Sequence, residues 1–189
     1  MRYVISAVLF IILLVGVIFL LFKSLASGPT KKPINMGDYY NTNMQVRFVQ
    51  DGIINSDQLH RSIAITVNKS NVNITVYQGY QGNILSSNDM PNNEQAYHNL
   101  LLSLNSLGYR VSKTSPFSKV NGLCPLGLRY SYQITNAPTN INQNLWSTTC
   151  SQGTIAGKFG SIQSVMKNQI PNYNPITNSV NLSQAFNQF

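Results

Sequence analysis

The chain has two cysteines, Cys124 and Cys150, and they offer most of its chemistry. Two thiols in one domain are compatible with three states: a structural disulfide, a nucleophilic thiol with a spare, or two buried apolar side chains. The choice bears on location, because disulfides persist in oxidising compartments outside the cytoplasm. The strand pairing expected around these residues, described below, favours the disulfide.

A cysteine enzyme is the chemically active alternative. The segment Trp146–Cys150 (WSTTC) is faintly similar to the active-site strand of sortases, which are single-anchor surface enzymes. Such an enzyme needs a histidine before the nucleophilic cysteine and an arginine after it, to activate the thiol and hold the oxyanion. His60 and His98 precede Cys150, but no arginine follows it, and Cys124 is available to block the thiol.

Other catalytic chemistry is poorly represented. None of the five carboxylates pairs with another at a helical or strand spacing suited to acid–base work; they are Asp38, Asp51, Asp57, Asp89 and Glu94. Residues 51–57 lack the EF-hand spacing and its terminal glutamate. The sequence has no metal-ligand cluster, phosphate-binding loop or nucleophile-elbow motif. We therefore expect no cofactor, no metal and no enzymatic activity.

Three short patterns have ordinary explanations. Glu94 and His98 share one helix face, as a solvated pair would. The segment Gly79–Gly82 (GYQG) is more typical of a bend after a strand than of a ligand cradle. The N-x-S/T tripeptides matter only in a host that glycosylates them; they begin at Asn68, Asn73 and Asn181.

The elements that position these residues begin with a hydrophobic run. Tyr3–Phe22 is 20 residues long without a charge, and a helix of that length spans about 30 Å, the thickness of bilayer hydrocarbon. We predict a transmembrane anchor over residues 1–22 that contacts the lipid bilayer through Tyr3–Phe22. The alternative is a cleaved signal peptide ending near Ala26–Gly28, but the run exceeds the usual apolar length of a signal, and Lys23 interrupts the approach to the cut.

The orientation of the anchor depends on two opposing signals. Lys23, Lys31 and Lys32 follow the run, and the positive-inside rule would place the next domain in the cytoplasm. That rule weakens for long translocated segments, and only 10% of residues are charged, against about 25% in typical soluble domains. We therefore expect a single-pass protein of the cell membrane with its C-terminal domain outside the cytoplasm.

Composition divides the remaining chain into three parts. Residues 23–42 are rich in Pro, Gly, Ser and Lys, and we expect a juxtamembrane linker whose lysines lie on anionic headgroups or in solvent. Residues 43–175 are expected to form one domain. Residues 176–189 form an Asn-rich tail, either an added edge strand or loose. From residue 43 onward, nine basic and four acidic residues are scattered without a basic stripe, a pattern that does not favour nucleic-acid binding.

Hydrophobic periodicity predicts an α+β domain with an antiparallel sheet covered by two helices. Strand signals with period two or β-formers occupy residues 44–48, 63–67, 72–76, 128–134 and 145–150. Turn residues 68–71 predict a hairpin over 62–77. Helical spacing of apolar residues occurs over 96–107 and 162–170.

The expected helix ends have recognisable capping residues. Asn92 or Asn93 can cap the start of the first helix, and Gly108 can close its end. Ser161 is the expected cap of the second helix, and Pro171 the residue that stops it.

Strand pairing also bears on the cysteines. We expect 128–134 and 145–150 to form a hairpin in which Cys124 faces Cys150 and, in the same register, Tyr130 faces Asn144. Facing cysteines can satisfy disulfide geometry, and closing a loop of about 27 residues stabilises a fold by roughly 3.5 kcal/mol. The disulfide Cys124–Cys150 is therefore the expected state, with two buried free thiols as the alternative.

Five stretches of the domain carry a resemblance: ITVYQGYQGNILSS, NNEQAYHNLLLSLNSLGY, CPLGLRYSYQ, LWSTTC and KNQIPNY. Together they resemble uncharacterised single-pass envelope proteins of Saccharibacteria, over about residues 44–175. The resemblance implies a bacterial cell-surface location, and it implies no known activity and no catalytic residues.

These observations predict a membrane-anchored extracytoplasmic domain that binds or assembles in the bacterial envelope rather than catalyses. A surface rich in Tyr and Asn suits contact with a protein or a glycan, because tyrosine supplies area and a hydrogen bond at low entropic cost. A structural subunit of an envelope complex or filament is one alternative, and a sortase-like cysteine enzyme is the other.

Overall fold

The computed structural model describes residues 15–16, 35–177 and 180–182. The predicted anchor, apart from residues 15–16, and the predicted linker up to residue 34 lie outside these residues. Within the described ranges, no helix is long and apolar enough to cross a membrane. The chain divides into two compact units, Met1–Ile34 and Asn35–Phe189, and the second contains the elements described below.

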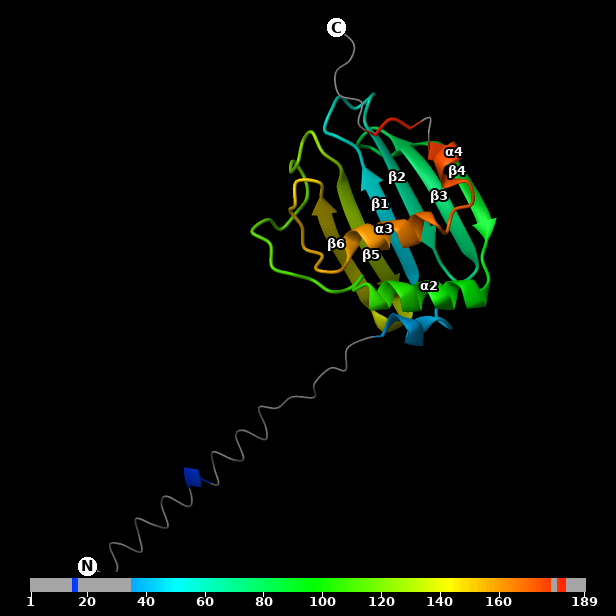
Figure 1. Ribbon diagram of the computed structural model, residues 1–189, viewed down its shortest axis with the longest axis vertical. Helices are drawn as coiled ribbons and strands as arrows, with labels where there is room; N and C mark the ends of the chain where they lie inside the picture. The colour runs from blue at the N-terminus through cyan, green and yellow to red at the C-terminus, as the bar shows by residue number, and fades with distance from the viewer. Residues whose placement is uncertain (1–14, 17–34, 178–179, 183–189) are drawn as a thin grey trace, which may run out of the picture. The chain divides into compact units, whose positions relative to one another are not determined.

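Six antiparallel strands form one sheet (Figure 1). The strands are β1 (Gln45–Asp51), β2 (Arg61–Val67), β3 (Asn71–Gln78), β4 (Asn83–Pro91), β5 (Arg129–Asn136) and β6 (Ile141–Thr148). Their order in space is β4-β3-β2-β1-β5-β6. The first four strands are therefore a meander, and the chain then crosses from the β4 edge to β5 on the far side of β1.

Two helices of nine residues or more accompany the sheet, α2 (Glu94–Ser106) and α3 (Phe159–Lys167). Shorter turns are η1 (Met36–Tyr39), η2 (Ala137–Thr139) and α4 (Tyr173–Thr177). Asn93 caps α2 by accepting a hydrogen bond from the Ala96 amide at 2.8 Å, as predicted for this position. The prediction for α3 was wrong at its start: the helix begins before Ser161, and Lys158 precedes it without a side-chain cap.

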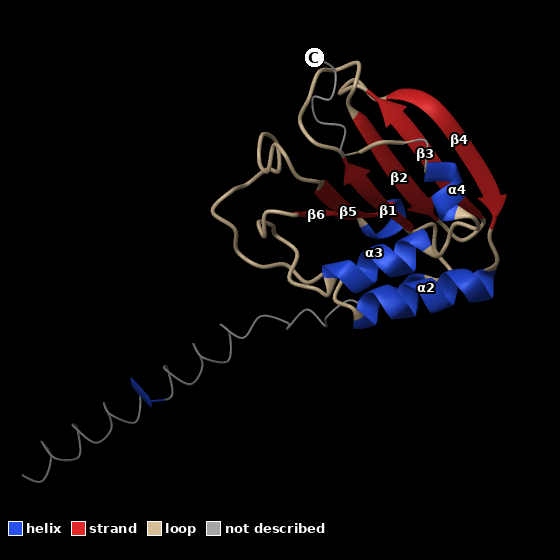
Figure 2. Ribbon diagram, turned by 45° about the horizontal axis from the view of Figure 1, so that its top comes forward, coloured by secondary structure: helices blue, strands red, loops and turns tan. Residues whose placement is uncertain are grey.

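The core lies between one face of the sheet and the helices (Figure 2). Alternate residues of β1 to β3 point into it, so the predicted period-two segments are confirmed as strands. The helix α2 contributes an apolar stripe that includes Leu101 and Leu104, and α3 contributes Ile162 and Met166. The predicted α+β class, with an antiparallel sheet and helices against it, is thus observed.

The opposite face of the sheet is mostly polar, and we call it the open face. Its side chains come from the alternate positions of the strands, and many are half-buried or exposed. It includes Arg47, Asp51, Ser62, Thr66, Asn73, Tyr77, Asp89, Ser131, Gln133 and Asn144. A sheet with one solvated face normally shows this alternation, so the open face is available for contact.

The hairpin of β5 and β6 has a different register from the predicted one. Tyr130 faces Ser147, not Asn144, because the turn is centred between Pro138 and Thr139 rather than at Ala137 and contains η2 followed by Asn140 in a left-handed conformation. The cysteines nevertheless bond to each other, with 5.7 Å between their Cα atoms. They do so outside the ladder, where the loop before β5 meets the turn after β6 (both residues lie beyond the strand ends).

Residues beyond both limits of the predicted domain pack in or against its core. Met36, in the predicted linker, is fully buried, and its amide donates to Asn105 Oδ1 at 3.1 Å. Val180 and Leu182, in the predicted tail, pack against the core, and the Leu182 carbonyl accepts from the Ile53 amide at 3.1 Å. The compact unit therefore begins at Asn35, and residues 180–182 lie against its core.

Candidate functional site

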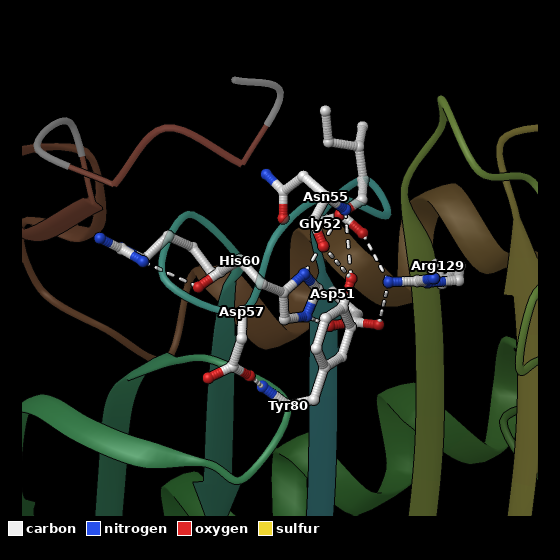
Figure 3. Close-up of polar contacts among 9 residues, drawn as sticks. Asp51, Gly52, Asn55, Asp57, His60, Tyr80 and Arg129 are labelled. Atoms are coloured by element: carbon white, nitrogen blue, oxygen red, sulfur yellow. Dashed lines mark hydrogen bonds and ion pairs between the residues drawn. The ribbon is translucent and has the colours of Figure 1, made fainter. Parts of the chain in front are cut away.

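A cluster of ionic side chains lies at the end of β1, centred on Asp51 (Figure 3). One Asp51 carboxylate oxygen is 2.8 Å from His60 Nε2, and the other is 2.6 Å from Arg129 Nη2. His60 Nδ1 is 3.1 Å from the Ile53 carbonyl, and Arg129 also donates to the Gly52 carbonyl at 2.8 Å. Since Arg129 is only 5% exposed, Asp51 is the carboxylate that compensates its buried charge.

The hydrogen bonds of His60 limit what this cluster can do chemically. Both ring nitrogens lie within hydrogen-bond distance of oxygen atoms, Nδ1 of the Ile53 carbonyl and Nε2 of the Asp51 carboxylate. A general base needs a nitrogen free to accept the substrate proton, and His60 has none in this arrangement. The cluster therefore orders the end of the sheet, as a charge pair that is costly to break.

Tyr80 covers this cluster from the turn between β3 and β4. Its ring stacks on the His60 ring with 4.1 Å between centroids, and its hydroxyl donates to the Asn55 carbonyl at 2.9 Å. The Tyr80 amide donates to an Asp57 carboxylate oxygen at 2.6 Å. Gly79, at φ +73°, provides the left-handed turn that brings Tyr80 there. The predicted bend at GYQG is confirmed, and it also forms part of a site.

Hydrogen-bonded polar side chains continue along the open face toward β4. The Asp89 carboxylate accepts from Asn71 at 2.7 Å and from Asn73 at 3.0 Å. These hydrogen bonds, from Asn71 first and Asn73 second, lower the pKa of Asp89. Asn73 also donates to Ser87 at 2.9 Å, and Ser87 lies 3.1 Å from the Thr75 hydroxyl. The open face thus presents amides, hydroxyls and a carboxylate in fixed positions.

Three adjoining hollows follow the open face. The Tyr77 hollow, of about 300 Å³, is lined by Arg47, Asp51, His60, Ser62, Tyr77, Gly79, Tyr80 and Gly82. The Ile54 hollow, of about 360 Å³, is lined by Asp51, Ile54, Tyr80, Val120, Asn121, Gly122 and Arg129. The Trp146 hollow, of about 510 Å³, is lined by Ser112, Lys113, Ser118, Lys119, Val120, Asn121, Ser131, Asn144, Leu145, Trp146 and Thr154.

The hollows share lining residues and so lie side by side, and we call the three together the track. Asp51 and Tyr80 border both the Tyr77 hollow and the Ile54 hollow. Val120 and Asn121 border both the Ile54 hollow and the Trp146 hollow. A ligand that fills more than one hollow would therefore cross the strands of the sheet, passing over the Asp51 cluster.

None of the three hollows is lined by the cysteines or by the pair Glu94 and His98, which the sequence analysis singled out. Cys124 and Cys150 form the expected disulfide, so neither sulfur is a free thiol. Glu94 makes an ion pair with Lys69 at 3.2 Å, and His98 lies against the Tyr40 ring with 4.6 Å between centroids. Among the described residues, no three His, Cys, Asp or Glu side chains come together in a way that could hold a metal ion.

Sequence reasoning missed the residues that this site brings together. Asp51 and His60 flank the connection between β1 and β2, and their pairing follows once those strands are known to be antiparallel neighbours. Arg129 comes from β5, far along the chain, and only the crossover after β4 brings it beside Asp51. The available signal was an arginine in a segment of otherwise strand-like residues.

Comparisons of the chain with family models, with curated proteins and with solved structures found no match. The resemblance to envelope proteins of Saccharibacteria stays a prediction. Function is therefore argued from the geometry of the site.

Proposed function

We propose that Asn35–Phe189 is the ligand-binding domain of a single-pass membrane protein of the bacterial envelope, displayed outside the cytoplasm. The observation that carries this proposal is the open face, on which three adjoining hollows form a track across the sheet. A concave surface with a few convergent polar groups is the usual form of a binding site.

Two further features support the proposed location. The Cys124–Cys150 disulfide suits an oxidising compartment, and the uncharged run Tyr3–Phe22 has the length of a membrane anchor.

The hydrogen bonds of His60 leave no ring nitrogen free for proton transfer. Binding therefore accounts for the site more simply than catalysis.

Site-specific photocrosslinking of the full chain in intact cells tests the binding role. A photoreactive amino acid at Thr66, on the open face, should give discrete crosslinked products with envelope components. The matched control is Gln95, an exposed residue of α2 on the helical side. Equal product patterns from both positions, or none from Thr66, would refute the open face as the binding surface.

The orientation has its own test. Protease added to intact spheroplasts should remove Asn35–Phe189 as completely as protease added to lysed cells. Protection in spheroplasts together with digestion after lysis would place the domain in the cytoplasm.

A structural subunit is the second candidate, and the β4 edge favours it. Ile84 and Leu85 on β4 are 65% and 50% exposed, and an edge strand offers unpaired backbone groups to another chain. Sedimentation of the full chain in detergent distinguishes the candidates, since a binding domain needs no self-association. A discrete large oligomer that is lost when proline replaces Ser87 would favour the subunit role.

A further inference from the structure

The Trp146 hollow is the largest of the three and is built from distant parts of the chain. Ser131 reaches it from β5, and Asn144 and Trp146 reach it from β6. Its remaining walls are the loop from Ser112 to Asn121 and the turn that contains Thr154. A hollow of about 510 Å³ falls within the range of small-molecule sites.

The loop that forms its outer wall is fixed at both ends. At one end, Ser112 pairs with Ile155, and the Lys113 amide donates to the Thr154 carbonyl at 2.7 Å. At the other end, Cys124 is bonded to Cys150. A wall held in this way is formed before a ligand arrives, which lowers the entropic cost of binding.

The charge of the hollow is positive and is not compensated locally. Lys113 and Lys119 line it, and no carboxylate does. The ion pairs found among the described residues involve His60, Lys69 and Arg129, and neither Lys113 nor Lys119. Both lysines are exposed, so their ammonium groups are available to an anionic ligand.

The remaining lining groups are those that bind hydroxyl-rich ligands. Asn121 and Asn144 are exposed amides on opposite walls, and Ser131 and Thr154 add hydroxyls. Trp146 is only 5% exposed, and its indole N–H has no hydrogen-bond partner among the described residues.

The track gives the ligand its length. The Trp146 hollow shares Val120 and Asn121 with the Ile54 hollow, where Tyr80 offers an exposed aromatic ring. Beyond it lies Arg47 in the Tyr77 hollow, whose guanidinium is 3.5 Å from the Tyr77 hydroxyl. Basic groups therefore stand at both ends of a track lined by amides, hydroxyls and aromatic rings, and the one carboxylate between them, Asp51, is paired with His60 and Arg129.

Resting on the proposed binding function, we infer that this track binds an extended acidic sugar chain, one that bears carboxylate or phosphate groups. The acid groups pair with Lys113 and Lys119, and the ring hydroxyls bind to the amides and hydroxyls of the hollow. Phosphate or carboxylate beside two ammonium groups forms charge-assisted hydrogen bonds, which are stronger than neutral ones.

The chain supplies its own probe for the test, because Trp146 is its only tryptophan and lies in the hollow. The full chain in nanodiscs of zwitterionic lipid is titrated with a galacturonic acid hexamer, with a sugar-phosphate oligomer of equal length, and with the neutral cellohexaose. At least one acidic oligomer should change the Trp146 emission at concentrations tenfold or more below those that cellohexaose requires.

Charge-matched variants locate the binding. The double variant K113Q/K119Q should weaken the acidic oligomer at least tenfold. The control K158Q/K167Q removes the same two charges from α3 and the residue before it and should leave affinity within twofold. Circular dichroism of K113Q/K119Q should match that of the parent, since Lys113 and Lys119 are exposed, and the same measurement checks that the control folds, because Lys167 is half-buried over the Tyr173 ring.

Three results would overturn the inference: no response to either acidic oligomer, equal affinity for cellohexaose, or equal losses in the two double variants. Crosslinking from Thr66 keeps the two proposals separate. If it still gives discrete products while the acidic oligomers fail, the binding function stands and only the ligand class is wrong.

Discussion

Removing the charge of Asp51 should destabilise the domain more than any other single carboxylate change. In D51N, the buried Arg129 guanidinium loses the carboxylate that it faces at 2.6 Å. The amide that replaces the carboxylate has one NH₂ group, which must face either Arg129 or His60. Breaking a buried pair by removing one partner costs about 3–5 kcal/mol. Asp51 is 33% exposed, and water compensates part of the loss, so we expect the lower limit, about 3 kcal/mol.

A double-mutant cycle isolates the pair itself. R129M removes the cation and leaves Asp51 with His60 and solvent, so its cost should be about 1–2 kcal/mol. D51N/R129M removes both charges, and its cost should be about 2 kcal/mol less than the two single costs together. The assay is urea unfolding of the full chain in detergent, followed by Trp146 fluorescence, with slopes compared to confirm that the unfolded states are similar.

The exposed pair between Lys69 and Glu94 is the matched control. Their side chains are 37% and 52% exposed at an ion-pair distance of 3.2 Å, and such pairs contribute about 0.2–1 kcal/mol. The cycle of K69M and E94Q should therefore give a coupling below about 1 kcal/mol. If D51N costs less than that, or if both cycles give equal coupling energies, the Asp51 cluster does not order the sheet end as argued.

Other perturbations have equally definite outcomes. Replacing both cysteines by serine should lower the unfolding free energy by about 3.5 kcal/mol, measured by urea unfolding, and a loss below 1 kcal/mol would contradict the stapling role. G79A should lower the unfolding free energy by about 1 kcal/mol more than G82A. Both glycines have positive φ, but only at Gly79 would a Cβ lie 2.8 Å from Asp57 Oδ1. Equal melting temperatures of the two variants would contradict this prediction. Burial raises the pKa of Tyr97 and Tyr173 to about 12. An unfolded tyrosine ionises near pH 10, so the stabilisation from these two tyrosines should be complete below pH 10 and be lost as the pH rises toward 12. Absorbance at 295 nm should then show tyrosines that ionise late. A single ionisation phase near pH 10 would refute the raised pKa values.

The strands that bury one face could be predicted from hydrophobic periodicity, whereas β4, which buries neither face, could not. Ile63 and Ile65 alternate with less apolar residues because β2 has a core side and an open side. The edge strand β4 has exposed residues on both faces, including the neighbours Ile84 and Leu85, so it carries no periodic signal. Its existence follows from the backbone hydrogen bonds that β3 offers on its outer side.

The disulfide was predicted correctly from an incorrect register. The prediction had Cys124 face Cys150 in register at the open end of the hairpin, whereas Cys124 has φ +51° and lies in the loop before β5. Loop conformation is set by contacts from distant segments, here the Pro125 carbonyl, which accepts from the Ile54 amide at 2.8 Å. Periodicity reports only on regular elements, and the candidate site consists largely of such loops.

The Asp51 cluster and the point where the chain enters the domain lie at opposite ends of β1. The chain enters the domain through η1, below the start of β1, whereas the Asp51 cluster lies where β1 ends (Figures 1 and 3). A strand of seven residues extends about 20 Å, so the Asp51 cluster lies about that far from the point where the chain enters β1. A polymer bound over the Asp51 cluster would therefore lie clear of η1.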